Sequence, residues 1–144
     1  MLRAKRLAKR HGLPFLDTDQ EIERRCGASV STIFDLEGEA GFRDLETAVL
    51  GQITGWHSLV VATGGGVVTR PENWGHMRQG VVIWLDAPEA ELLRRLNADP
   101  TPRPLLSSDD PAARLQALLQ ERLPLYGQAD LRISQGDGTP EQVA

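Results

Sequence analysis

The sequence predicts an α/β fold of three layers, in which a parallel β-sheet carries helices on both faces. Short apolar runs alternate along the chain with longer segments whose apolar residues recur at helical spacing. The runs at residues 58–63 and 81–86 are almost continuously apolar, which is typical of strands buried on both faces of a parallel sheet. Because 40% of the 144 residues are hydrophobic and 25% are charged, we expect a single domain over residues 1–144.

The first half of the chain predicts helix, strand and further helices. Residues 2–11 predict an amphipathic helix that ends at Gly12. A strand at residues 13–17 leads into Thr18-Asp19-Gln20-Glu21, which has the form of a capping box at the start of the next helix. Residues 34–37 and 39–53 then predict helical segments, the second with an apolar side made of Phe42, Leu45, Val49, Leu50 and Ile53.

The second half continues the alternation of strands and helices. Its expected elements are a strand at 58–63, a helix from Pro71, a strand at 81–86, a helix at 88–97, a helix at 111–126 and a strand at 131–134. Residues 98–110, rich in proline, serine and aspartate, predict an exposed loop suited to closing as a lid. A helix start at residues 139–141 lies close to the end of the sequence, so we expect a domain that is incomplete at both ends.

Composition excludes several classes of protein. No apolar run approaches the roughly 18 residues needed to span a membrane, and the basic N-terminal segment has no apolar core of a secretion signal. The formal net charge of −4 is not the basic footprint of a nucleic-acid-binding protein. Cys26 is the sole cysteine and is expected to be inert. We expect a cytoplasmic monomer that binds neither nucleic acid nor membrane.

Two aspartates stand where a ligand site is expected. Asp17 ends the predicted strand at residues 13–17, and Asp19 lies at the start of the following helix. Ligands of parallel sheets bind at the carboxyl ends of the strands, so at least one carboxylate is expected to face a ligand. The alternative is that Asp19 or Thr18 only caps the helix.

Three glycines, Gly64, Gly65 and Gly66, follow the strand at residues 58–63 directly. Glycines in such a place let the backbone approach a ligand closely and point N–H groups at it. A flexible linker is the alternative, but apolar character resumes at once in Val67-Val68, which disfavours it.

Arginine dominates the basic residues. Of the sixteen lysines and arginines, only Lys5 and Lys9 are lysines. Arginine suits bidentate recognition of a carboxylate or a phosphate, although a compositional bias gives the same count. Arg43 follows a core-facing phenylalanine, Arg103 stands between two prolines of the expected lid, and Arg122 lies on the last long helix. Each of the three also fits a solvated surface charge.

Five motifs in separate segments together resemble the shikimate kinase family. They are Phe15-Leu16-Asp17-Thr18-Asp19, Glu37-Gly38-Glu39-Ala40-Gly41-Phe42-Arg43, Thr63-Gly64-Gly65-Gly66, Arg103-Pro104-Leu105-Leu106 and Glu121-Arg122-Leu123-Pro124-Leu125-Tyr126. The resemblance implies a P-loop kinase fold of the nucleoside monophosphate kinase type. It also implies transfer of the γ-phosphoryl group of ATP to the 3-hydroxyl of shikimate, a step toward chorismate and the aromatic amino acids.

The resemblance further implies a role for each matching residue. Arg43 and Arg122 would clamp the carboxylate of shikimate, beside Gly64, Gly65 and Gly66. Asp19 would bind hydroxyl groups and act as the base, and Asp17 would lie in the outer shell of Mg²⁺. Arg103 would balance charge on the transferring phosphoryl group, and Arg95 would face the nucleotide.

The phosphate-binding motif of the family, G-x-x-x-x-G-K-[ST], does not occur in the sequence. The strand that precedes this motif in the family lies between the strands that here end at Thr63 and Asp86, so we expect two unpaired strand edges. We also expect negligible kinase activity from residues 1–144 by themselves. The alternative function is that of a non-catalytic, shikimate kinase-like binding protein or a fragment without an ATP site.

Overall fold

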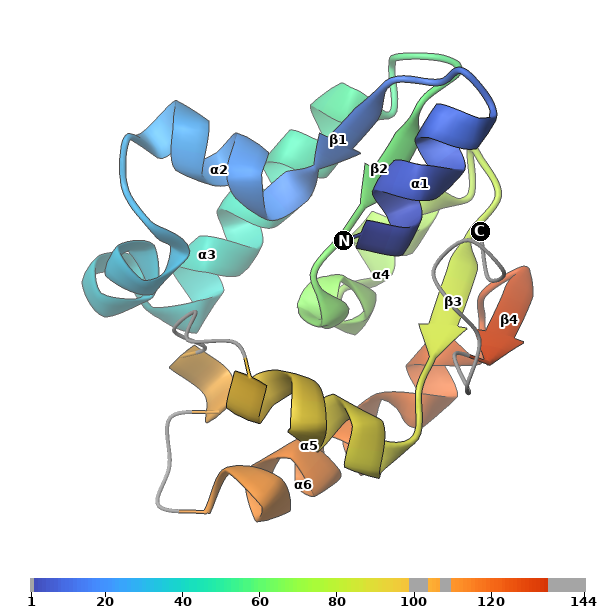
Figure 1. Cartoon of the computed structure of the whole chain (residues 1–144). Helices are drawn as coiled ribbons and strands as arrows, with labels where there is room; N and C mark the ends of the chain where they lie inside the picture. Colours follow the sequence, from blue (N-terminus) through green and yellow to red (C-terminus); the bar gives the residue numbers. More distant parts are fainter. Residues whose placement is uncertain (1, 99–103, 107–109, 135–144) are drawn as a thin grey trace. The chain divides into compact units, whose positions relative to one another are not determined.

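The computed structural model describes residues 2–98, 104–106 and 110–134. Figure 1 shows the elements of the chain in order. The contacts divide the chain into two compact units, one made of the described residues up to Val81 and the other of those from Val82 onward.

The first unit contains a two-stranded parallel sheet. Its elements are α1 (Leu2–Arg10), β1 (Phe15–Asp17), α2 (Thr18–Cys26), α3 (Val30–Ile53), β2 (Val60–Ala62), the 3₁₀ helix η1 (Gly65–Thr69) and α4 (Pro71–Met77). In the sheet, Phe15 pairs with Val60 and Asp17 pairs with Ala62. Both strands therefore end at the same edge, and the segments that follow them start from neighbouring points.

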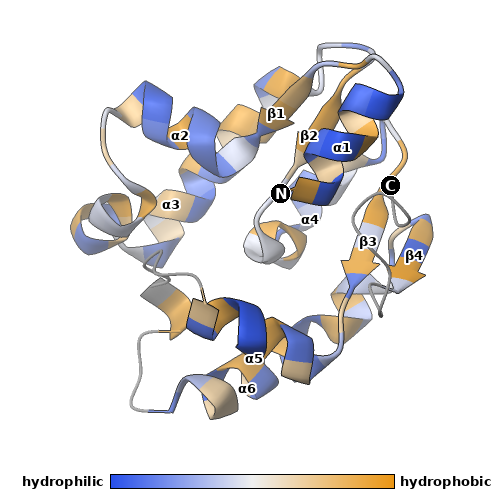
Figure 2. Ribbon diagram, viewed as in Figure 1, coloured by the Kyte–Doolittle hydropathy of each residue, from blue (hydrophilic) through white to orange (hydrophobic). Residues whose placement is uncertain are grey.

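Helices cover both faces of this sheet. Leu16 and Val61 lie opposite each other and pack against the core formed by α2 and α3, whose buried side chains are Ile22, Ile33, Phe42, Val49 and Ile53. Phe15 points to the other face, where the Lys5 Nζ of α1 lies 5.7 Å from its ring centroid. The expected three layers are thus present in this unit, with a mostly hydrophilic α1 on the outside (Figure 2).

Helix α3 bends at Gly38. This glycine has φ of 71° and ψ of 179°, a conformation that residues with a Cβ rarely adopt. The two helical segments expected at residues 34–37 and 39–53 therefore meet at this non-helical glycine inside the range of α3. The kink begins the segment that carries Glu39 and Arg43.

The second unit contains the other parallel pair of strands. Its elements are β3 (Ile83–Asp86), α5 (Glu89–Ala98), the short 3₁₀ helix η2 (Pro104–Leu106), α6 (Pro111–Tyr126) and β4 (Leu131–Ser134). Ile83 pairs with Leu131, and the Trp84 ring stacks on Tyr126 of α6 with centroids 5.6 Å apart. Across the described ranges of both units, no helix is long and apolar enough to cross a membrane.

The strands pair in parallel as expected, but they form two separate sheets of two strands each. The expectation that residues 58–63 and 81–86 are buried on both faces is wrong. Every residue of β2 is only half-buried, and Ile83 and Leu85 of β3 are each 37% exposed. The reason is that each of these strands is paired at one edge only, so its other edge has no neighbouring strand among the described residues.

Candidate active site

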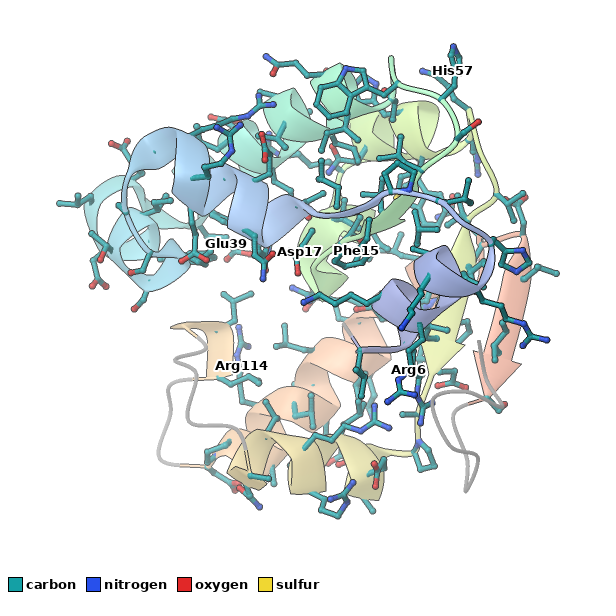
Figure 3. All side chains as sticks on the ribbon, turned by 45° about the horizontal axis from the view of Figure 1, so that its top comes forward. Arg6, Phe15, Asp17, Glu39, His57 and Arg114 are labelled. Atoms are coloured by element: carbon teal, nitrogen blue, oxygen red, sulfur yellow. The ribbon has the colours of Figure 1, made fainter. Side chains whose placement is uncertain are left out.

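Asp17 links the end of β1 to the start of α2, and it is the residue that caps the helix. Its Oδ1 accepts hydrogen bonds from the backbone N–H groups of Asp19 at 2.9 Å and Gln20 at 3.3 Å. The expectation that Thr18 or Asp19 begins the helix as its cap is therefore wrong. Figure 3 shows the Asp17 side chain at this junction. Because Asp17 fills the capping role, the carboxylate of Asp19 is left for other contacts.

The Asp19 carboxylate faces the backbone of Gly64. A Cβ placed on Gly64 would lie 3.5 Å from Asp19 Oδ1 and 3.7 Å from Glu46 Oε2, so the two acidic groups approach the same glycine. Asp19 Oδ1 is buried and has no hydrogen-bond partner among the described residues. Burial, followed by the nearby charges of Asp17 and Glu46, raises the pKa of Asp19 to about 6, while Arg43 acts in the opposite direction.

Arg43 is buried in α3 beside two acidic residues of the same helix. Its Nη1 donates a hydrogen bond of 2.8 Å to Glu46 Oε1, and its Nε lies 3.7 Å from Glu39 Oε1. Residues three and four positions apart share one face of a helix, so the helix itself brings these charges together. Arg43 Nε is buried without a hydrogen-bond partner among the described residues, so the guanidinium keeps a donor for a further acceptor.

The three glycines form the start of η1, with Gly64 at its cap. None of them has a positive φ, so their small size rather than their conformation is what the site uses. At Gly66 a Cβ would overlap the guanidinium of Arg43, which packs directly on this backbone. The glycine backbone therefore lies in close contact with the Arg43 guanidinium, and its expected approach to a ligand stays a prediction.

Side chains of α4 hold the backbone of η1 through hydrogen bonds. The Asn73 side-chain amide donates to the carbonyl of Val67 at 3.0 Å, and the Trp74 indole donates to that of Val68 at 3.1 Å. Within the turn, the Thr69 hydroxyl donates to the carbonyl of Gly66 at 2.7 Å. Buried side-chain donors thus fix the backbone that faces Asp19 and Arg43.

The structure brings together Asp17, Asp19, Arg43 and Gly64–Gly66 in the first unit. The polar atoms of Asp19 and Arg43 that lack partners belong to one cluster, and buried polar groups of native proteins are normally hydrogen-bonded. A ligand with hydroxyl groups and a carboxylate would satisfy both. The cluster therefore has the chemistry of a binding site for a small, polar, acidic molecule.

The remaining candidates belong to the second unit or lie outside the described residues. Arg122 on α6 is 9% exposed and has no ion pair with any described residue. Buried arginines normally have an anionic partner, so Arg122 is available to a ligand anion. Arg95 donates to Glu91 Oε1 at 2.8 Å, and its expected role toward a nucleotide stays a prediction. Arg103 and most of the expected lid at 98–110 lie outside the described residues.

Sequence reasoning missed Glu46, which is 1% exposed and binds Arg43. The available signal was its position three residues after Arg43 on a helix, a spacing that serves exposed and buried ion pairs alike. It also missed Asn73, fully buried under the glycine turn. Both residues reveal their role only through the packing of α3 and α4 around η1.

Comparisons with known proteins agree on one family. A family model described as shikimate kinase matches residues 3–144. The shikimate kinase of Synechococcus sp. (strain RCC307) is 62% identical over 136 residues, which make up 94% of this chain and 70% of that protein. The shikimate kinase of Synechococcus sp. (strain CC9605) is 58% identical over 138 residues, which make up 96% of this chain and 69% of that protein.

Solved structures give the same result. A shikimate kinase from Acinetobacter baumannii in complex with shikimate matches with a TM-score of 0.92 at 40% identity, over 96% of this chain and 78% of that one. A shikimate kinase from Aquifex aeolicus matches with a TM-score of 0.83 at 33% identity, over 99% of this chain and 83% of that one. The family model, the relatives and the structures therefore confirm the resemblance and the P-loop kinase fold, and the chain belongs to the shikimate kinase family.

Proposed function

We propose that this protein transfers the γ-phosphoryl group of ATP to the 3-hydroxyl of shikimate. The observation that carries the proposal is the cluster of Asp19, Arg43 and Glu46 beside the glycine turn, in which buried polar atoms of Asp19 and Arg43 have no hydrogen-bond partner among the described residues. Shikimate carries a carboxylate and several hydroxyl groups, which match a guanidinium donor and a carboxylate acceptor. Family membership supports the same substrate.

In this proposal Arg43 binds the substrate carboxylate, and the family resemblance assigns the same role to Arg122. Arg43 keeps its Nε for an acceptor while Glu46 holds its Nη1 in place. Arg122 is buried without a described anion. Charge-assisted hydrogen bonds from guanidinium groups fix a carboxylate in direction as well as in position. The substrate ring is thereby oriented before any reaction takes place.

Asp19 accepts the proton of the 3-hydroxyl. Its pKa of about 6 leaves most of this carboxyl ionised at neutral pH and makes it a stronger base than an ordinary aspartate. As the proton moves to Asp19, the 3-oxygen bonds to the γ-phosphorus and ADP leaves. Phosphoryl transfer depends mainly on positioning and charge, so the fixed neighbours of Asp19 matter as much as its basicity.

The residues present fit Mg²⁺ bound through water. Asp17 Oδ1 is taken by the two backbone donors of the helix cap, and no described residue donates to its Oδ2. The described residues contain no group of three or more side chains able to hold a metal ion. Mg²⁺ commonly keeps several waters and binds through one or two carboxylates together with nucleotide phosphates, where it neutralises phosphate charge. Asp17 is the residue of this chain that would hold it.

Shikimate binding tests the proposal directly. Calorimetric titration of residues 1–144 with shikimate is expected to show saturable binding, and the methyl ester of shikimate, which lacks the carboxylate charge, is expected to bind at least tenfold more weakly. Arg43→Ala should remove binding, whereas Arg24→Ala, on the exposed face of α2, should not. A wild-type chain that is folded and does not bind shikimate contradicts the proposal. ADP formation with MgATP, measured on the same samples, tests the expectation of negligible turnover by residues 1–144.

A further inference from the structure

Two arginines cross between α3 and the glycine turn in opposite directions. Arg43 reaches from α3 to the backbone of Gly66. Arg70, the residue after η1, reaches back to α3, where its Nη1 lies 2.7 Å from Asp44 Oδ1 and its Nη2 donates to the carbonyl of Ala40 at 3.3 Å. Ala40 and Asp44 stand on either side of Arg43 along the helix. The turn and the substrate-facing part of α3 are thus tied together at both ends.

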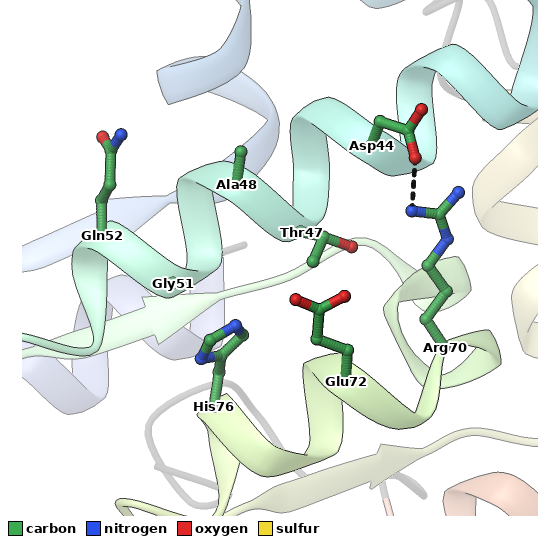
Figure 4. A pocket seen from close by; sticks show the side chains of 8 residues that line it. All are labelled: Asp44, Thr47, Ala48, Gly51, Gln52, Arg70, Glu72 and His76. Carbon is green, nitrogen blue, oxygen red and sulfur yellow. Dashed lines mark hydrogen bonds and ion pairs between the residues drawn. The ribbon is translucent and has the colours of Figure 1, made fainter.

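The ion pair of Arg70 with Asp44 lies at a groove between α3 and α4. This groove has a volume of about 370 Å³, and its lining includes Asp44, Gly51, Arg70 and His76. In Figure 4 the ion pair of Arg70 and Asp44 bridges one end of this groove, next to the turn. Gly51 and His76 approach each other farther along the groove. The Arg70–Asp44 ion pair therefore joins the two sides of the groove at the end next to the turn.

The fold does not need this bridge to form the turn. The turn is already held by the buried donors of Asn73 and Trp74. The side chains of Arg70 and Asp44 are 32% and 73% exposed, and exposed ion pairs add little to the stability of a protein. A contact of this kind affects the position of η1 relative to α3 more than it affects the stability of the fold.

We propose that Arg70 is a positioning residue for the acid substrate, acting through the glycine turn and Arg43. The proposal rests on the function proposed above. While Arg70 holds Ala40 and Asp44, Gly66 stays in contact with the Arg43 guanidinium and the backbone of Gly65 stays beside the substrate carboxylate. Without Arg70 the turn moves relative to α3, and Arg43 loses the surface that orients it.

Shikimate binding by Arg70 variants tests the proposal. Arg70→Ala is expected to raise the Kd for shikimate roughly threefold to tenfold, the size of effect that residues without ligand contact exert on a nearby site. Arg70→Lys keeps the charge and should recover part of the affinity. The control is Arg24→Ala, which removes the ion pair of an exposed arginine with Glu21 on α2 and should leave the Kd unchanged. Thermal denaturation of each variant measures stability separately.

Charge reversal gives the sharper result. Arg70→Asp should weaken binding at least as much as Arg70→Ala, and combining it with Asp44→Arg should recover affinity, because the exchanged pair rebuilds the bridge. An unchanged Kd in folded Arg70→Ala overturns the proposal, and so does a double variant that binds no better than Arg70→Asp. If the wild-type chain itself does not bind shikimate, the function proposed above fails instead, so the two failures are distinguishable.

Discussion

The guanidinium of Arg43 occupies the space that a Cβ on Gly66 would need. The absence of a side chain at Gly66 is therefore needed for the position of the Arg43 guanidinium. A methyl group at residue 66 would displace this buried side chain, which is also paired with Glu46. A buried group pushed from its partner leaves charge without compensation, which proteins tolerate poorly. The relationship links a backbone position on η1 to a binding side chain on α3.

Gly66→Ala is expected to reduce shikimate affinity by at least tenfold, because the methyl group displaces the Arg43 guanidinium. The change should also destabilise the fold by about 1–3 kcal/mol through overpacking. Calorimetry and urea denaturation measure the two effects. The matched control is Gly75→Ala in α4, where a Cβ has no atom within 4 Å. That change should leave affinity alone and stabilise the helix by roughly 0.5–1 kcal/mol. Equal shikimate affinities of Gly66→Ala and Gly75→Ala would contradict this role of Gly66.

Much of this site could be predicted from the sequence, because its parts stand at the ends of strands. Asp17, Asp19 and Gly64–Gly66 follow β1 and β2, and parallel pairing brings the ends of those strands together. Arg43 could be placed by its position beside Phe42. Local pattern therefore suffices where a short element carries a residue straight to the sheet edge.

What the sequence could not provide depends on packing between elements. In the sequence Glu46 looks like an ordinary helix-surface charge, and Arg70 looks like an ordinary surface charge before a helix. Only the packing around α3 buries Glu46 and gives Arg70 its partner Asp44. The sequence pattern points to Thr18 or Asp19 as the helix cap, whereas Asp17 is the cap, because α2 begins directly where β1 ends. The strands of residues 58–63 and 81–86 have the apolar composition of buried strands, yet composition does not say how many neighbours a strand has.

The raised pKa of Asp19 predicts that the ionised carboxylate needed for proton transfer destabilises the folded state. The folded state holds the Asp19 proton more tightly than the unfolded chain, whose aspartates titrate near 3.8. The free energy of unfolding should therefore fall as the pH rises from about 4 to about 6, by at most roughly 3 kcal/mol before allowance for partial exposure.

Asp19→Asn removes the loss of unfolding free energy that accompanies ionisation of Asp19. The variant should be more stable than the wild type at pH 7, by about 1–2 kcal/mol, and should lose this advantage below pH 4. Chemical denaturation at the two pH values measures the difference. Because the amide accepts no proton, turnover of any active form should fall far more than shikimate affinity does. A wild type and variant with parallel pH profiles would show that Asp19 titrates normally.

Arg122 should act mainly through the ligand. Arg122→Ala is expected to weaken shikimate binding by at least tenfold, because a charge-assisted contact is lost, while stability changes little since no described acidic group depends on this arginine. Arg132→Ala is the control within the same unit, because Arg132 pairs with Asp86 on the sheet. The control should leave the Kd unchanged. An Arg122→Ala chain that binds shikimate normally would remove this residue from the site.

Asp17 has two roles that substitutions can separate. As the cap of α2 it accepts from the backbone of Asp19 and Gln20, so Asp17→Ala should lower the free energy of unfolding by about 0.5–2 kcal/mol. Asp17→Asn preserves the cap acceptor and should keep nearly all of that stability.

The asparagine still removes a negative charge that raises the pKa of Asp19. The pKa of Asp19, followed by carboxyl NMR, should therefore move from about 6 toward its ordinary value in Asp17→Asn while the unfolding midpoint barely changes. Asp17→Ala should lower both the pKa of Asp19 and the unfolding midpoint. If asparagine destabilises the protein as much as alanine does, capping is not the structural role of Asp17. If the titration of Asp19 stays where it was, the Asp17 charge does not raise the pKa of Asp19, and burial together with Glu46 accounts for the shift.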